Sequence, residues 1–373
     1  MTQAFQPIPA RPAPRHTVGA MARLRLNFFS SLPNTLVTVL LLTAAGWLLL
    51  KGLDWGVIHA VFAADADRCQ AARGLGACWG VVNEKARFIL LGRYPQEEQW
   101  RPVLASFALM TPVFASCSRR FWRPSLALVW VVGLALFFVL MGGGVGGLGK
   151  VPTDLWGGLP LTLMLTVLSM VLAFPLAVLV ALGRRSDMPA IRAMCLAYIE
   201  LVRGVPLISV LFMASFMFPL FMPVGKTPDV LVRVVIGITL FAAAYMAEII
   251  RGGLQTVGRG QIEAAASMGL TYWQAQRKIV LPQALAAVVP SIVNNFISLF
   301  KDTSLVTIVS LYELTGALSL ALGSDPNWRP FKIEAYLFIA AIYFAFCYAM
   351  SRYSLRLEKR LAVSRPGKDT AHD

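Results

Sequence analysis

Long apolar runs separated by short polar segments recur along most of this 373-residue sequence. A helix that crosses a membrane needs roughly 20 apolar residues, and about 17–25 is the usual range. Eight runs reach or approach that length, so we predict an all-α, polytopic membrane bundle of about eight transmembrane helices. The predicted spans are 34–50, 102–117, 124–142, 158–183, 205–224, 231–250, 281–300 and 335–351. A ninth stretch, 305–322, contains Glu313 and several polar residues, and we interpret it as a helix in an outer loop.

Composition and charge support a membrane protein and orient it. The chain is 57% hydrophobic and 14% charged, whereas soluble domains are about a quarter charged, yet its formal net charge is +15. With the N-terminus inside, the inner segments carry +14 of that charge, as the positive-inside rule expects. We therefore predict cytoplasmic termini in a lipid bilayer, and no nucleic-acid partner. Those inner segments are 1–33, 117–123, 184–204, 248–280 and 352–373.

Residues with catalytic or metal-binding spacing are missing from the sequence. The glycine-rich segment 143–151 matches most of a P-loop, but Val151 occupies the position of the magnesium-binding Ser or Thr. No strand precedes that segment, so we interpret it as a turn. The three histidines lie far apart, and we expect no catalytic residue, metal or cofactor. Cys69 and Cys78 share the large outer loop as a disulfide or as free thiols, and their spacing leaves both open.

The inner segment 248–280 contains the most informative pattern. Good helix formers fill 261–268, and Gly269 is suited to end a helix. Glu263 is expected near the helix start, where it complements the dipole, and Pro282 is expected to mark the beginning of the next span. The three alanines 264–266 give a low-profile surface that another protein could approach closely. An amphipathic helix resting on lipid headgroups is the alternative.

The order of residues in this segment resembles the E-A-A-x(3)-G-x(9)-I-x-L-P signature of ABC-transporter permeases. The resemblance implies a loop that docks into a cleft of the ATPase subunit. The matching residues, with the family's spacing, are Glu263, Ala264, Ala265, Gly269, Ile279, Leu281 and Pro282.

Three further segments are similar to the polar-amino-acid, MetI-like branch of that family. They are Tyr198–Leu207, Glu248–Gly253 and Asn294–Leu305, and the likeness covers about 155–360. The strongest likeness is to general L-amino-acid permeases of bacterial uptake systems. We therefore expect a cytoplasmic tail at 1–33, a three-span extension with a periplasmic loop at 34–150, the permease domain at 151–358 and a tail at 359–373.

Several of the matching residues are candidates for function. Two pairs of opposite charges are spaced three residues apart, so each pair shares one helix face: Glu200 with Arg203, and Glu248 with Arg251. They are either ion pairs that anchor the helix ends at the membrane interface, or contacts that brace the signature loop against the bundle. Lys301 and Asp302 could meet the two charges of an amino acid, pair with each other, or touch a delivering protein. Polar residues beside them either line a path or bridge helices. These are Asn294, Asn295, Thr303 and Ser304.

The resemblance implies a non-enzymatic permease subunit in the bacterial inner membrane that imports polar or general L-amino acids by alternating access. It also implies two ATP-binding subunits, a second permease chain and a periplasmic amino-acid-binding protein. A secondary carrier without an ATPase is the alternative, but the usual intramembrane ionisable residues and paired broken helices are not evident. A membrane-embedded enzyme lacks a catalytic cluster.

Overall fold

The computed structural model describes residues 19–223 and 225–363, and these ranges contain helices, turns and two isolated bridges but no strand. The predicted all-α class is therefore confirmed. The chain forms two compact units, 1–80 and 81–373. The predicted domain boundary after residue 150 stays a prediction.

The first unit holds the first predicted span. Helix α1 covers Ala20–Phe28, and α2 covers Leu32–Leu53. Ser31 caps α2 by accepting a hydrogen bond from the backbone of Asn34, and the helix continues through a π-turn to Ile58. Part of the predicted tail, 1–33, is thus helical, while its first 18 residues lie outside the described ranges.

A disulfide closes the small loop region of the first unit. Helix α3, Ala66–Ala71, begins at Asp65, whose carboxylate accepts hydrogen bonds from the next backbone amides. Cys69 in α3 is bonded to Cys78, and both side chains are fully buried. Of the two states left open by the sequence, the structure has the disulfide.

The second unit begins with helices that the extension contributes. They are α4 (Gly80–Leu91), α5 (Trp100–Ser116) and α6 (Ser125–Gly142). Arg101 at the start of α5 is buried, and its guanidinium donates to the carbonyls of Leu140 (2.7 Å) and Gly149 (2.9 Å). It thereby ties the end of α6 to the glycine-rich turn.

The glycine-rich turn is shaped by close backbone contacts. Gly143 has a φ of +64°, and a Cβ there would lie 1.9 Å from the carbonyl oxygen of Gly149. Only glycine fits such a position without strain. The segment is therefore a turn, as predicted, and positive φ angles account for Gly143, Gly144, Gly146 and Gly147.

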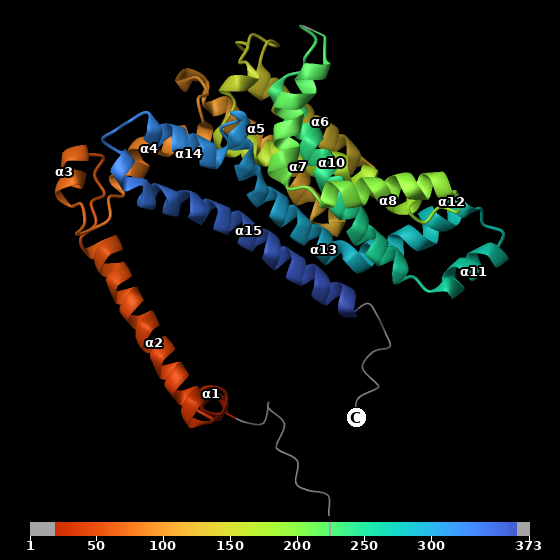
Figure 1. Cartoon of the computed structure of the whole chain (residues 1–373), viewed down its shortest axis with the longest axis horizontal. Helices are drawn as coiled ribbons and strands as arrows, with labels where there is room; N and C mark the ends of the chain where they lie inside the picture. Colours follow the sequence, from red (N-terminus) through yellow and green to blue (C-terminus); the bar gives the residue numbers. More distant parts are fainter. Residues whose placement is uncertain (1–18, 224, 364–373) are drawn as a thin grey trace, which may run out of the picture. The chain divides into compact units, whose positions relative to one another are not determined.

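The second unit is built on four long helices (Figure 1). They are α7 (Gly158–Gly183), α10 (Val230–Gln255), α13 (Leu281–Asp302) and α15 (Lys332–Val363). Of these, α7 and α10 contribute most of the buried core. Helix α10 packs along α7 and α13, α13 packs along α15, and α5 packs on α6 and α7. Small residues such as Ala242, Ala243 and Ala247 line the buried face of α10 and allow this close approach.

Six helices of the described chain are long and apolar enough to cross a membrane, or seven if one bent pair is a single span. The predicted count of about eight is therefore approximate. The difference is the predicted span 102–117, which corresponds to α5, a helix of 17 residues. That length is at the lower limit for crossing the hydrocarbon core.

A sharp bend lies at the start of the predicted span 205–224. Helix α8, Pro189–Arg203, is followed at a bend of 102° by α9, Leu207–Phe212, and by π- and 3₁₀-turns that end at Phe221. Pro206 lacks the N–H that would continue the α8 ladder, so the helix ends before it. The bend turns α8 away from the direction of α9.

Helix α13 begins at Leu281, as predicted for the span 281–300, with Pro282 in its first turn. The helical segment nevertheless starts at Tyr272 and runs through α12 (Tyr272–Ala275) and a π-turn at Gln276–Val280 into α13 without a break. Pro282 therefore marks the start of α13 but does not separate it from the preceding helical turns. Proline lacks an N–H and its ring crowds the preceding turn, and the wider π-turn beside it relieves that crowding.

The stretch 305–322 is no span, as predicted. A 3₁₀-turn continues α13 to Val309, and α14 covers only Leu314–Gly323. Glu313 caps α14 with a fully buried carboxylate, which accepts from the backbone amides of Thr315 and Gly316 at 2.9 Å and from the Tyr343 hydroxyl at 2.9 Å. This capping carboxylate holds α14 against α15 at the end of the bundle where α13 ends.

Candidate functional site

A short helix projects from one end of the bundle. Helix α11 covers Arg259–Ser267 and ends in the left-handed turn predicted at Gly269, whose φ is +72°. The amide of Gly269 donates to the carbonyl of Ala266 (2.9 Å), and that of Leu270 donates to Ala265 (3.1 Å). This pair of bonds is a Schellman motif, which ends the helix sharply and favours glycine at that position.

The small residues of α11 divide between an inner and an outer face. Ala265 is buried against the bundle, where α11 packs on the π-turn before α13. Glu263 and Ala264 are exposed, and a Cβ on Gly269 would meet nothing within 4 Å. The outer face is therefore low and open, and it carries one acidic group. The other signature residues, Ile279, Leu281 and Pro282, lie on the adjoining helix.

One expectation for this helix is wrong. Helix α11 begins at Arg259, two residues earlier than the predicted start at 261, and its first turn contains no acid. Glu263 lies in the second turn, so it does not complement the dipole at the helix start. Its exposed carboxylate instead points to a role at the surface.

Helix ends meet at Glu248, near the base of α11. Its carboxylate binds Arg184 at 2.5 Å and Arg251 at 2.5 Å, and Arg203 lies 3.9 Å away. The Glu248–Arg251 pair is as predicted. The predicted pairing of Glu200 with Arg203 is replaced, because Glu200 lies 4.0 Å from Arg184 and Arg203 lies near Glu248.

This Glu248 cluster, formed with Arg184, Arg203 and Arg251, joins three elements. Arg184 follows α7, Arg203 ends α8, and the other two residues belong to α10. The Glu248 side chain is only 24% exposed, so its ion pairs are shielded more than those of a surface salt bridge. The cluster therefore fixes the ends of α7, α8 and α10 beside the segment that leads into α11.

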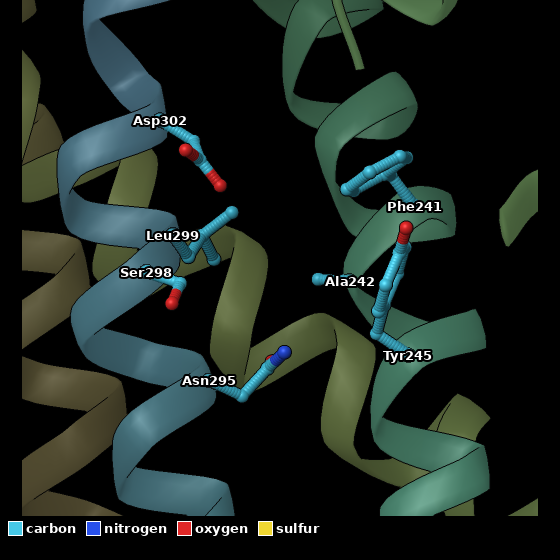
Figure 2. A pocket seen from close by; sticks show the side chains of 7 residues that line it. All are labelled: Phe241, Ala242, Tyr245, Asn295, Ser298, Leu299 and Asp302. Atoms are coloured by element: carbon cyan, nitrogen blue, oxygen red, sulfur yellow. The ribbon is translucent and has the colours of Figure 1, made fainter. Parts of the chain in front are cut away.

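A cavity of about 230 Å³ lies between α10 and α13. Figure 2 shows Asn295, Ser298 and Asp302 on one side, facing Phe241 and Tyr245 on the other. The Oδ1 atom of Asn295 is buried without a hydrogen-bond partner in the described structure. A buried amide oxygen without a partner is unfavourable, and it marks a place that a ligand donor or water can satisfy.

The predicted path residues do not all reach this cavity. Asn295 and Asp302 line it, whereas Asn294 and Lys301 are exposed elsewhere on α13. Thr303 is buried and donates to the carbonyl of Phe300 at 2.7 Å, which indicates a structural role. Ser304 is half-buried and does not line the cavity. The structure thus separates Asp302 from Lys301, which the sequence had presented as a pair.

Some residues of these sites carry little signal in the sequence. Arg184 belongs to a basic inner segment, and its place directly after a predicted span is a usable signal of its role. Ser298 lies one turn from Asn295 and Asp302, so helical spacing could have found it. Phe241 and Tyr245 gave no local signal, because only the packing of α10 on α13 brings them to the cavity.

Comparison with known proteins agrees with this architecture. The family described as "Binding-protein-dependent transport system inner membrane component" matches residues 173–363. The amino-acid ABC transporter permease protein YhdY of Escherichia coli (strain K12) is 42% identical and aligns with 98% of this chain and 99% of its own. The chain belongs to this family. Its predicted resemblance to ABC-transporter permeases is thereby confirmed.

Other relatives of this permease family differ in how much of the chain they cover. The glutamate/glutamine/aspartate/asparagine transport system permease protein BztC of Rhodobacter capsulatus is 37% identical over 94% of this chain and 96% of its own length. The probable glutamine permease protein GlnP of Bacillus subtilis (strain 168) is 35% identical over 55% of this chain but 93% of its own. The extended relatives therefore share regions that the shorter ones do not.

Among solved structures, a chain of "an amino acid ABC transporter with histidines" has 32% identity and a TM-score of 0.48, covering 54% of this chain and 92% of that one. Family membership makes this chain a multi-span permease component of the inner membrane, not an enzyme. It also implies ATP-binding and substrate-binding partners.

Proposed function

We propose that this chain is one of two different permease subunits in an importer that carries amino acids inward, driven by two ATP-binding subunits. The observation that carries the proposal is the exposed helix α11, which bears the family's signature at the end of a bundle whose relatives are amino-acid permeases. ATP closes the two ATPase subunits on each other, α11 moves with them, and the bundle alternates between its two openings. A periplasmic binding protein delivers the amino acid.

The termini and α11 face the cytoplasm in this proposal. The concentration of basic residues in the segments 184–204 and 248–280 supports that side. The Cys69–Cys78 disulfide supports the opposite side for the loop that contains it, because disulfides persist in oxidising compartments such as the periplasm.

A second permease chain covers α13 in this proposal. In the most apolar 18-residue stretch of the segment Tyr272–Val309, only 11% of the residues are buried within the chain. Asn294 and Ser298 are exposed on it, and amides and hydroxyls in a membrane favour partners on neighbouring helices. A second permease bundle provides such partners, whereas lipid tails do not.

Asp302 binds the α-ammonium group of the amino acid, and Asn295 accepts a further hydrogen bond from it. The cavity that these residues line is large enough for a small amino acid, and its aromatic wall of Phe241 and Tyr245 suits the carbon skeleton. We expect Asp302→Asn to raise the KM for uptake about tenfold, since a charge-assisted hydrogen bond contributes about 1.5–3 kcal/mol.

The matched control for that variant is Lys301→Gln, on the neighbouring residue outside the cavity. It should leave the KM within about twofold, as exposed charges contribute little. Both are measured as initial rates of labelled amino-acid uptake by the assembled complex. An unchanged KM in Asp302→Asn would remove Asp302 from the path.

The proposed function itself is tested by reconstitution. The full complex in proteoliposomes should take up labelled amino acids only with the binding protein outside and ATP on the side of the N-terminus. Cleavage of an N-terminal tag by a protease identifies that side of the membrane. A variant of the ATPase that binds but does not hydrolyse ATP is the control. Uptake driven by an ion gradient through this chain without an ATPase would instead establish a secondary carrier.

A further inference from the structure

A polar cavity of about 510 Å³ lies at the end of the bundle where α13 ends. Residues after α4, together with α4 itself, form most of its wall, and the end of α14 closes it. Helix α11 lies where α13 begins, so this cavity and α11 are at opposite ends of α13 (Figure 1). We call it the α4–α14 cavity.

Two arginines in the α4–α14 cavity are held by neutral groups. Arg87 donates twice to the side-chain oxygen of Gln99, at 3.1 and 2.7 Å. Arg93 donates to the backbone carbonyl of Asp154 at 2.5 Å, and its guanidinium lies 5.2 Å from the ring centroid of Tyr312. Among the described residues no carboxylate pairs with either arginine, so two positioned positive charges remain uncompensated.

The other charged groups at the cavity are one lysine and two carboxylates, which leave it a net charge of +1 together with the two arginines. Lys85 binds Asp325 at 2.7 Å and lies 3.7 Å from Glu84. The hydrogen bond from Lys85 holds the pKa of the Asp325 carboxyl below its usual value, so that carboxyl is ionised at neutral pH. The Lys85–Asp325 ion pair fixes α4 to the end of α14, and Arg87 and Arg93 exceed the remaining carboxylate, Glu84, by one positive charge.

The cavity lies beside a helix that contacts the long helices of the bundle. Helix α14 packs against α7 and α15, so a displacement of α14 by a bound partner would be passed to these two helices. The wall from α4 to Gln99 lies outside residues 173–363, which the family shares. Relatives such as GlnP, which cover only 55% of this chain, reach 93% of their own length, so much of this chain has no counterpart in them.

We propose that the α4–α14 cavity is a docking surface for an acidic patch on the periplasmic binding protein, with carboxylates of that protein paired to Arg87 and Arg93. This inference rests on the proposed function. Guanidinium groups with free donors favour carboxylates, often in a two-point geometry. The end opposite α11 is the side from which the amino acid is delivered, and charge pairs formed in contact there would fix the orientation of the partner.

The experiment measures binding of the purified binding protein to the complete complex in nanodiscs at several salt concentrations. The double variant Arg87→Glu, Arg93→Glu should raise Kd at least about tenfold, and the rise of Kd with salt should disappear or reverse, because like charges then face each other and salt screens their repulsion. The variant with both positions changed to Lys should keep the salt dependence but lose part of the affinity, because an ammonium group keeps the charge without the two-point geometry. Arg329→Glu, an exposed arginine outside the cavity, is the matched control and should change Kd less than about twofold.

The outcomes separate this inference from the proposed function. ATPase activity without the binding protein should be unchanged in the double variant, which shows that the complex is assembled. If the wild-type complex shows no ATP-driven uptake, the proposed function fails. If it does, any of three results overturns the docking surface. The Kd of the binding protein could be unchanged in the double variant, or it could vary with the anionic lipid content of the nanodisc and not with the substitutions. The third result is a changed KM for free acidic amino acids with a normal Kd for the binding protein.

Discussion

Glu248→Ala is expected to abolish the coupling of ATP hydrolysis to uptake. The substitution leaves Arg184, Arg203 and Arg251 together without their shared carboxylate, and two of these arginines bind it at 2.5 Å. Loss of a shielded, hydrogen-bonded charge costs on the order of 2 kcal/mol, and mutual repulsion of the three cations adds to it. We expect the ends of α7, α8 and α10 to separate, so that movement of α11 no longer reaches the bundle.

The measurement compares uptake with ATP hydrolysis by the assembled complex, and it includes thermal unfolding of the purified chain. Glu248→Ala should lower uptake at least about tenfold while much of the hydrolysis continues, with a small decrease in Tm. Glu200→Gln is the control, since that carboxylate is 61% exposed and lies 4.0 Å from Arg184. Its effect should be within about 1 kcal/mol, the usual limit for exposed pairs. Equal effects of the two variants would contradict a central role for Glu248.

Replacement of Gly269 by phenylalanine is expected to lower uptake to a degree comparable with Glu248→Ala. The cause differs, because this substitution weakens contact with the ATPase and leaves the helix bundle intact. Gly269 lies on the open face of α11, where an added side chain meets no atom of this chain. Its φ of +72° imposes a backbone cost of about 1–3 kcal/mol on most residues, which displaces the turn that ends α11. The bulky ring also obstructs the surface that receives the ATPase.

Gly269→Asn separates these two causes. Asparagine tolerates the left-handed conformation better than phenylalanine, and its side chain is small. Binding of the purified ATPase to the permease chains should weaken at least about tenfold in Gly269→Phe, which corresponds to ~1.4 kcal/mol, and only slightly in Gly269→Asn. Glu263→Lys, which alters charge without backbone strain, should also weaken binding. Normal ATPase affinity in all three variants would remove α11 from the contact.

The membrane spans were predictable because their signal is local. A run of about 20 apolar residues has few alternatives to a membrane helix, and α7 matches its predicted limits of 158 and 183. Helix continuity at prolines was harder to predict, because proline can either end a helix or be accommodated within it. Pro206 ended a helix as expected of proline, whereas Pro282 was accommodated by a π-turn inside a continuous helix. The same residue type thus has opposite outcomes, which are decided by the packing around it.

The candidate sites were predictable only in part. Gly269 was recognised because a helix stop requires positive φ, which is a property of the backbone itself. Glu248 and Arg251 were recognised because they are three residues apart on one helix. Arg184 is 64 positions away from Glu248 in sequence, and no spacing rule connects them. The partner of a charge is chosen by which helix ends meet.

The sequence by itself determined that this chain is a bundle of membrane helices with a basic side and one helix that carries the permease signature. These features depend on hydropathy, net charge and residue order, which need no knowledge of packing. The tertiary structure decided that three arginines gather around Glu248, that Asp302 without Lys301 lines one cavity, and that Arg87 and Arg93 line a second cavity beside the end of α14. Each depends on side chains from distant segments, and their approach is fixed by the packing of α7, α10, α13 and α14.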